Sequence, residues 1–373
     1  MDITIQREAL LKPLQAINGI IEKKQTLPIL SNVLLTVQPD KDNAEKKLSL
    51  TGTDYEIELV GFVAIESMIN EGATTVSARK LFDICRVLPE GICLRLTLEK
   101  NYLVVRANES CFMLNTLPPQ EFPQLEASNY PTQFMLKQHH LKNLLTRTYF
   151  AMGQQDVRHY LNGAFLDIQH QTIKCIAADG HRLALTSIQD ESIHQVEAKI
   201  ILPRKSVLEL MRLLGDEAAP PATLCISDQR FRVITSDYIF TSKLINAQYP
   251  DYNRLIPRGT TIATGEREMI KQALIRASIL LNEKFRGVRF QFEPNKLLIT
   301  ANNSDQEQAE EAVSLEYEGN KIEIGFNVAY LLDIVSAMTA KCIRCVFSDP
   351  NNGVLIESAE NDHSLYVVMP MRL

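Results

Sequence analysis

The chain has 373 residues, of which 45% are hydrophobic and 23% are charged, and its formal net charge is −6. This length predicts two or three domains with separate cores, and the negative charge excludes a protein that is basic over its whole surface. Seven scattered cysteines favour a reducing compartment over a disulfide framework. Neither a secretory leader nor a membrane-length apolar run is present, so we expect a cytoplasmic protein.

Four landmarks recur in the same order along the chain, about 125 residues apart. An amphipathic helix opens each unit, at 7–17, 138–152 and 266–280. The other three landmarks are a polar turn after an apolar strand, a strand that enters a second amphipathic helix, and a closing strand. In the three units the turns lie at Asp54, Asp179 and Asn302, the second helices begin near Arg79, Arg204 and Asn327, and the closing strands contain Phe112, Phe240 and Tyr366.

The strands between these landmarks are short and partly alternating, which is typical of antiparallel sheet. The sequence therefore predicts an α+β protein of three repeated domains, each with two helices packed on antiparallel sheet. Proline-rich segments at 117–131 and 246–259 indicate linkers, so we place the domains at 1–125, 126–253 and 254–373. The segment YVVMPMRL (366–373) is then the third closing strand, with no domain to connect to.

No catalytic motif is evident. Nucleotide-binding loops, GxSxG, HExxH and EF-hand loops do not occur. Cys342 and Cys345 have CxxC spacing, but they lie in an expected strand, where their side chains would point to opposite faces. Asp179-Gly180-His181-Arg182 is interpreted as a turn that contacts a partner, because Asp-Gly favours turns. We expect no metal and no cofactor.

Charge is patterned along the repeats. Lys12, Lys142 and Lys271 take equivalent places in the opening helices, and a rotational arrangement of the units would gather them on one basic surface. Such a surface suits sequence-independent contact with phosphates. The acidic run around Glu310 is either a solvated edge or half of a charged interface. An enzyme with duplicated domains and a repetitive peptide-binding adaptor without DNA are the alternative classes.

The whole chain resembles the bacterial sliding clamp, the beta subunit of DNA polymerase III. The resemblance is carried by TLPIL (26–30), SLTGTD (49–54), QDVRHYLNG (155–163), DGHRLA (179–184), PRKSVLELMR (203–212), FTSKLINAQYPDY (240–252), NEKFRGVR (282–289), ITANN (299–303), EIGFN (323–327) and YVVMPMRL. It implies the DNA clamp fold and a head-to-tail homodimer that closes into a ring around duplex DNA. Such a ring catalyses nothing and confers processivity by tethering the polymerase.

The partners that the resemblance implies are a second copy of the chain, duplex DNA without sequence preference, the polymerase III catalytic subunit, the clamp loader complex, and other polymerases and repair proteins that carry clamp-binding peptides. The DNA contacts it implies are Lys24, Arg79, Arg86, Gln155, His159, Tyr160, Arg204 and Lys205. Family members often carry arginine at position 24 and tyrosine at position 159, so those two contacts differ here.

The resemblance also implies a partner-peptide pocket with mostly apolar walls and flexible methionines. Its residues would be Leu161, Gly180, His181, Arg182, Leu183, Pro250, Arg254, Leu255, Phe285, Asn327, Tyr330, Val367, Val368, Met369, Pro370, Met371 and Arg372. Ala178 stands where relatives often have threonine, which removes one hydroxyl.

The implied dimer interface joins apolar and charged residues of two subunits. Phe112 and Leu114 would meet Ile279 and Leu280, and Lys80 and Arg106 would face Glu307, Glu310 and Glu311. Tyr102, Glu109 and Cys111 replace arginines that relatives carry near this edge, so we expect fewer charge pairs there. The charged segment 38–47 is predicted to be a hairpin loop without an assigned role.

Overall fold

The computed structural model describes residues 1–21, 27–39, 46–125, 128–193, 196–282, 286–360 and 363–372. Lys24, Phe285, Leu373 and most of the segment 38–47 lie outside these ranges. The chain forms two compact units, one of residues 1–138 with 212–244 and the other of residues 139–211 with 245–373. Each unit is described separately below.

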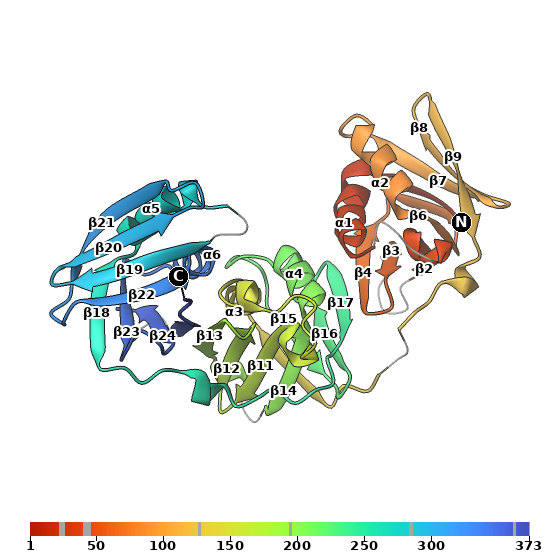
Figure 1. Cartoon of the computed structure of the whole chain (residues 1–373). Coiled ribbons are helices and arrows are strands. Elements are labelled where there is room, and N and C mark those ends of the chain that lie inside the picture. Colours follow the sequence, from red (N-terminus) through yellow and green to blue (C-terminus); the bar gives the residue numbers. More distant parts are fainter. Residues whose placement is uncertain are drawn as a thin grey trace. The chain divides into compact units, whose positions relative to one another are not determined.

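Three repeats of helices and strands follow one another along the chain (Figure 1). The first contains β1 (Asp2–Gln6), α1 (Arg7–Ile20), β2 (Asn32–Pro39), β3 (Lys46–Thr53), β4 (Ile57–Ala64), β5 (Ser67–Asn70), β6 (Gly72–Ser77), α2 (Ala78–Val87), β7 (Cys93–Glu99), β8 (Tyr102–Ala107) and β9 (Ser110–Leu117). The second contains β10 (Thr132–Leu136), α3 (Gln138–Thr146), β11 (Gly163–Gln169), β12 (Thr172–Ala178), β13 (Arg182–Gln189), β14 (Ala198–Pro203), α4 (Arg204–Leu213), β15 (Ala222–Ile226), β16 (Arg230–Ile234) and β17 (Tyr238–Lys243).

The third repeat contains β18 (Thr261–Glu266), α5 (Arg267–Ala277), β19 (Gly287–Glu293), β20 (Lys296–Asn302), β21 (Gln308–Glu316), β22 (Ile322–Asn327), α6 (Val328–Ala337), β23 (Cys342–Phe347), β24 (Val354–Ser358) and β25 (Ser364–Val368). Two helices and antiparallel strands therefore recur in every repeat, as the sequence predicts. Two details differ. A short strand precedes each opening helix, and the closing strand β25 ends at Val368, so Met369–Arg372 lie outside it.

Each unit contains one continuous antiparallel sheet. The order in the first unit is β10-β15-β16-β17-β4-β3-β2-β6-β9-β8-β7-β1-β5, and in the second it is β14-β11-β12-β13-β25-β24-β23-β18-β21-β20-β19-β22. The central repeat contributes strands to both sheets. Its closing strand β17 pairs with β4 of the first repeat, and its strand β13 pairs with β25 of the third. Backbone hydrogen bonds thus join successive repeats.

The opening helices are fixed by their first residue. The Arg7 guanidinium donates to the carbonyl oxygen of Cys85 (2.7 Å), at the end of α2, and Arg267 donates to that of Val335 (3.1 Å), at the end of α6. The last carbonyls of a helix have no partner within it and carry partial negative charge, so a cation stabilises them. In the central repeat, neutral Gln138 takes this place and bonds Gly215 and Pro220, just after α4.

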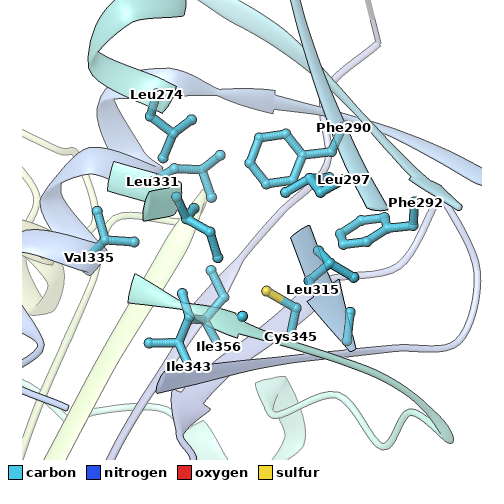
Figure 2. Close-up of a pocket in the computed structure, with 13 residues that line it drawn as sticks. Leu274, Phe290, Phe292, Leu297, Leu315, Leu331, Val335, Ile343, Cys345 and Ile356 are labelled. Carbon is cyan, nitrogen blue, oxygen red and sulfur yellow. The ribbon is translucent and has the colours of Figure 1, made fainter. Parts of the chain in front are cut away.

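The core of the third repeat lies between its two helices and its strands. Leu274 of α5 and Leu331 of α6 point toward Phe290 of β19 and the other apolar side chains in Figure 2, around a cavity of about 10 Å³. Cys345 lies in this core, and burial raises the pKa of its thiol to about 12. The neighbouring Cys342 is half-buried. Both cysteines lie in β23, so this CxxC pair is part of a strand, as the sequence predicts.

Candidate partner groove and nucleic-acid interface

The predicted partner pocket, called the groove below, is centred on the junction of β13 and β25 in the second unit. Arg182 pairs with Val368 and Leu183 with Val367 across this junction. Below it lies a cluster of buried apolar side chains that includes Leu161, Leu183 and Val367 from the predicted pocket. The cluster also contains Phe165, Ile176, Ala178, Leu185, Ile201, Tyr252, Val346 and Leu355. The side chains that underlie the predicted pocket are therefore apolar and buried.

Beyond β25 the chain continues as an exposed apolar segment. The amide of Met369 donates to the carbonyl oxygen of His181 (2.8 Å), and that of Met371 donates to Gly325 (2.9 Å). The Met369 and Met371 side chains nevertheless remain 45% and 40% exposed, and Leu255 is 52% exposed. Gly325 is a residue of β22, so the segment is bonded to that strand as well as to the turn before β13. The backbone of this segment is fixed by hydrogen bonds, whereas its methionine side chains are exposed and flexible, so they form an apolar surface that can adapt to a ligand.

The turn before β13 carries the polar side of the groove. The Asp179 carboxylate accepts hydrogen bonds from the amides of His181 (2.9 Å) and Arg182 (3.0 Å). Gly180 has φ +89°, a conformation that suits glycine, and a Cβ there would lie 2.8 Å from the Arg158 guanidinium. Arg158 in turn binds Asp156 and holds the pKa of that carboxyl at about 2. The turn predicted from Asp-Gly is present.

Arg182 is engaged by the protein itself. Its guanidinium donates to Asp179 (3.0 Å), to Asp333 (2.6 Å) and to the carbonyl oxygen of Phe150 (2.6 Å). It also lies 4.4 Å from the centre of the Tyr330 ring, and the side chain is only 11% exposed. Arg182 therefore connects the turn to α6. Asp333 has no sequence signal, since its position follows from helix packing.

The remaining predicted pocket residues have varied settings. Asn327 caps α6 by accepting a hydrogen bond from the amide of Ala329 (3.0 Å), and Tyr330 stacks against His181 with ring centres 6.2 Å apart. Burial raises the pKa of Tyr330. Arg254 is exposed and pairs with Asp251 (3.1 Å). Pro250 and Arg372 are exposed, Val368 is buried and Pro370 is half-buried, whereas Phe285 lies outside the described residues.

A polar hollow of about 450 Å³ adjoins α4 in the same unit. It is lined by Gly153, Gln154, Gln155, Asn162 and Arg204, so it brings together two of the predicted DNA contacts. Arg204 donates to the carbonyl oxygens of Tyr149 and Met152 (3.3 Å each). Burial, followed by the nearby Arg182 charge, lowers the pKa of Arg204. A half-buried cation beside amide groups suits an anion.

The other predicted DNA contacts are spread over both units. His159 and Tyr160 lie in a short 3₁₀ helix (His159–Leu161); His159 is exposed, and Tyr160 packs edge-on against Tyr249 with ring centres 6.1 Å apart. Lys205 is half-buried in α4. In the first unit, Arg79 and Arg86 flank Asp83 on α2, with nitrogen–oxygen distances of 3.8 and 3.1 Å, and both are exposed. Lys24 lies outside the described residues.

In the parts of the chain that the structure describes, the sheet-end strands β5, β10, β14 and β22 pair on one side only, and two strands inside the sheet order, β9 and β21, also have stretches that pair on one side only. Residues Ser110–Asn115 of β9 pair only with β8, and Gln308–Ser314 of β21 pair only with β20. On β9, Leu114 is buried and Phe112 half-buried, and after α5 Ile279 is 75% exposed and Leu280 half-buried. Such edges are templates for another strand.

Three of the five charged residues predicted for the dimer interface have partners within the chain. Arg106 pairs with Glu99 (3.1 Å), and Glu311 forms a double hydrogen bond with Arg276 (2.6 and 2.9 Å), which lowers the pKa of Glu311. Glu307 accepts a hydrogen bond from Asn303 (2.6 Å). Lys80 and Glu310 are exposed. Contact of Glu311 with a second subunit would therefore compete with Arg276.

Nothing in this arrangement resembles a reaction centre. Within the described ranges, no group of three or more histidine, cysteine, aspartate or glutamate side chains could hold a metal ion. In the same ranges, no helix is long and apolar enough to cross a membrane. Repeated sheet domains, exposed methionines beside an apolar cluster and strand stretches that pair on one side only are features of proteins that bind other chains.

Comparison with known proteins identifies which class of binding protein this is. The family models of the DNA polymerase III beta subunit match residues 1–126 (N-terminal domain), 135–251 (central domain) and 253–372 (C-terminal domain). The beta sliding clamp of Pseudomonas putida is 47% identical, with both chains fully covered. The crystal structure of the DNA polymerase III subunit beta from Pseudomonas aeruginosa superposes with a TM-score of 0.94 at 46% identity, again over both full chains.

A further P. aeruginosa structure is that of a sliding clamp bound to griselimycin, with a TM-score of 0.94, 46% identity and full coverage of both chains. The fold and the comparisons define a DNA sliding clamp, a processivity factor of DNA replication without catalysis of its own. The chain belongs to the bacterial DNA polymerase III beta subunit family. Both alternatives from the sequence, an enzyme with duplicated domains and a peptide-binding adaptor that does not bind DNA, are therefore wrong.

Proposed function

We propose that two copies of this chain associate head to tail into a closed ring on duplex DNA and tether polymerases through the groove at the β13–β25 junction. The observation that carries this proposal is the repetition of the junctions. In each of the two junctions within the chain, a closing strand pairs with a strand that follows a polar turn. The equivalent strands β9 and β21 each retain an unpaired stretch. Pairing of β9 with β21 of a second copy repeats the same contact.

The repeat also predicts which residues meet at that interface. Phe112 of β9 is equivalent to Phe240 of β17, which pairs with Leu59 next to the start of β4. Placed likewise on β21, Phe112 and Leu114 lie near Ile279 and Leu280, which are exposed and half-buried respectively. Burial of these apolar side chains supplies the association free energy. Lys80 and Arg106 then approach Glu307, Glu310 and Glu311.

The DNA contacts are proposed to be sequence-independent. Arg79, Arg86, Arg204, Lys205 and Lys24 supply positive charge, while Gln155, His159 and Tyr160 supply hydrogen bonds. Contacts of this kind neutralise phosphates, so the affinity falls steeply with salt. An overall charge of −6 disfavours DNA on the rest of the surface.

The groove is proposed to bind short peptides of the polymerase III catalytic subunit, the clamp loader and other polymerases and repair proteins. Its apolar floor, the exposed methionines and the polar turn resemble other peptide sites, in which a few polar groups orient an apolar ligand. The domain boundaries at residues 125 and 253 and the cytoplasmic location are part of this proposal. They are supported by the linker segments and the reduced cysteines.

The deciding experiment compares nicked circular DNA with the same DNA after linearisation. The protein is loaded with a clamp loader and then separated from free protein by gel filtration. A ring stays on the circle and slides off the linear molecule, independently of sequence. Equal retention on both forms would overturn the ring.

A further inference from the structure

Arg182 of the predicted pocket is bound by Asp333, a residue outside that pocket. Asp333 of α6 accepts a hydrogen bond from Arg182 at 2.6 Å, one of the shortest ion pairs among the described residues. Its own side chain is 46% exposed, whereas that of Arg182 is 11% exposed. The pair joins the turn at 179–182 to a helix of the next repeat.

The connection runs through three neighbours. Asp179 holds both the Arg182 guanidinium and the amide of His181, so the turn and the guanidinium move together. Tyr330 lies one helical turn before Asp333 and therefore on the same face of α6. Its ring packs on the Arg182 guanidinium and stacks with His181. The carbonyl oxygen of His181 in turn holds Met369.

We propose that Asp333 is a positioning residue for partner binding: by fixing Arg182, it sets the spacing between the His181 turn and α6, the two walls between which a partner peptide is held. This inference rests on the proposed groove and adds a residue that touches no ligand. Without the carboxylate, Arg182 loses its only described link to an acid on α6. The His181 and Tyr330 rings then lose their fixed stacking, and Met369 loses a fixed anchor.

The test measures binding of a fluorescein-labelled peptide copied from the polymerase III catalytic subunit, with griselimycin as a competitor. Asp333→Asn keeps the shape of the side chain and removes its charge. We expect about tenfold weaker binding, because one charge-assisted hydrogen bond is lost. Asp333→Glu restores the carboxylate and should recover most of the affinity.

The matched control is Glu357→Gln. Glu357 accepts a hydrogen bond from Arg344 at 2.6 Å, on neighbouring strands β23 and β24 of the same unit, and belongs to no part of the groove. The control should bind the peptide with wild-type affinity. If both variants lose affinity equally, a general loss of stability in the second unit explains the effect and the proposal is wrong.

A spectroscopic readout separates positioning from mere stability. In the wild type the Tyr330 ring shields the His181 ring protons, so their NMR signals should move in Asp333→Asn and stay in Glu357→Gln. Arg182→Lys provides a second variant, because lysine cannot reach three acceptors in a plane. The effects of Arg182→Lys and Asp333→Asn should be less than additive if they act through one contact.

The outcomes distinguish the two proposals. If the wild type binds neither peptide nor griselimycin, the groove assignment fails and this inference fails with it. If the wild type binds and Asp333→Asn binds equally well or more tightly, only the positioning role is overturned. Tighter binding would instead show that Asp333 competes with the peptide for Arg182.

Discussion

The two junctions within the chain have the same backbone hydrogen-bond pattern but carry different side chains. At the first, the Asp54 carboxylate accepts hydrogen bonds from the amides of Glu56 and Ile57, and Lys243 donates its amide to Glu56. At the second, Asp179 accepts the equivalent bonds from His181 and Arg182, and Met369 donates to His181. The turn and the strand pairing are therefore the same. The side chains decide which junction can bind a partner.

The difference lies in four pairs of equivalent positions. Tyr55 (φ +74°) stands where Gly180 does, and the Glu56 and Lys243 side chains form an ion pair (3.1 Å) where His181 and Met369 leave an open groove. Ile57 replaces Arg182, so the first junction lacks the cation that reaches Asp333. Duplicated structure thus supplies two similar turns, and under the proposed function the substitution of a few residues distinguishes the partner site from its counterpart.

The largest expected effect is on the tail of the second junction. Deleting Met369–Leu373 should weaken binding of the polymerase peptide by about a hundredfold, because the exposed methionines and their backbone anchor are lost together. Lys243→Ala, the equivalent change at the first junction, should leave peptide binding unchanged. Fluorescence anisotropy measures both. Gel filtration should show an intact dimer, and unchanged peptide binding by the deletion would contradict the groove assignment.

The turns should respond oppositely to substitution. Gly180→Ala places a Cβ at positive φ and against Arg158, so we expect a loss of about 1–2 kcal/mol in the free energy of unfolding and weaker peptide binding. Tyr55→Gly relieves the same backbone conformation at the first junction and should gain less than about 1 kcal/mol. Urea unfolding measures both changes. If Gly180→Ala instead stabilised the protein, the turn would accept a side chain at this position without strain.

Acid should break the ion pair between Asp156 and Arg158, which lies beside the second turn. Asp156 has a pKa lowered from 3.8 to about 2 by its hydrogen bonds with Arg158. A carboxyl whose pKa is lower in the folded state stabilises the protein above its unfolded pKa, and this contribution is lost as the pH falls from 3.8 toward 2. The urea midpoint of Asp156→Asn should lie below that of the wild type at pH 7, and the gap should close below pH 3.8. A constant gap would exclude ionisation as its cause.

The smallest effect should come from the ion pair at the first junction. Glu56→Gln removes an exposed pair with Lys243, and such pairs contribute only about 0–1 kcal/mol. We expect a thermal midpoint within a few degrees of wild type and unchanged peptide binding. A large loss of stability would mean that this pair, and not the strand pairing of β4 with β17, holds the junction.

Much of the fold could be predicted from the sequence because its landmarks repeat. The turns at Asp54 and Asp179 and the closing strands lie where the periodicity indicates, and so do the helices, although the helices expected at 138–152 and 266–280 end earlier, at Thr146 and Ala277. The leading strands β1, β10 and β18 were missed, since five or six residues directly before a helix give little periodicity. Met369 leaves the strand because its amide bonds the turn at His181 rather than a neighbouring strand, which no local pattern encodes.

The candidate site was predictable only in part. Family motifs identified Gly180, His181 and Met369, and the structure brings these residues together. The role of Arg182 could not be read from sequence, because it depends on Asp333, 151 residues away along the chain. Phe150 contributes a carbonyl oxygen to the same contact, and backbone groups leave no trace in a motif.

The open strand edges also select among possible assemblies. Two copies of β21 brought together would place Glu307, Glu310 and Glu311 of one copy against those of the other, and like charges repel. The corresponding stretch of β9, Ser110–Asn115, carries no acidic or basic residue. The β21 edge is therefore a poor template for a second β21, and the β9 edge carries no charge that favours or opposes a second β9. Pairing of β9 with β21 brings no like charges together. In the proposed ring, the carboxylates at and beside β21 would therefore disfavour symmetric pairing of two β21 edges, which could not close a ring.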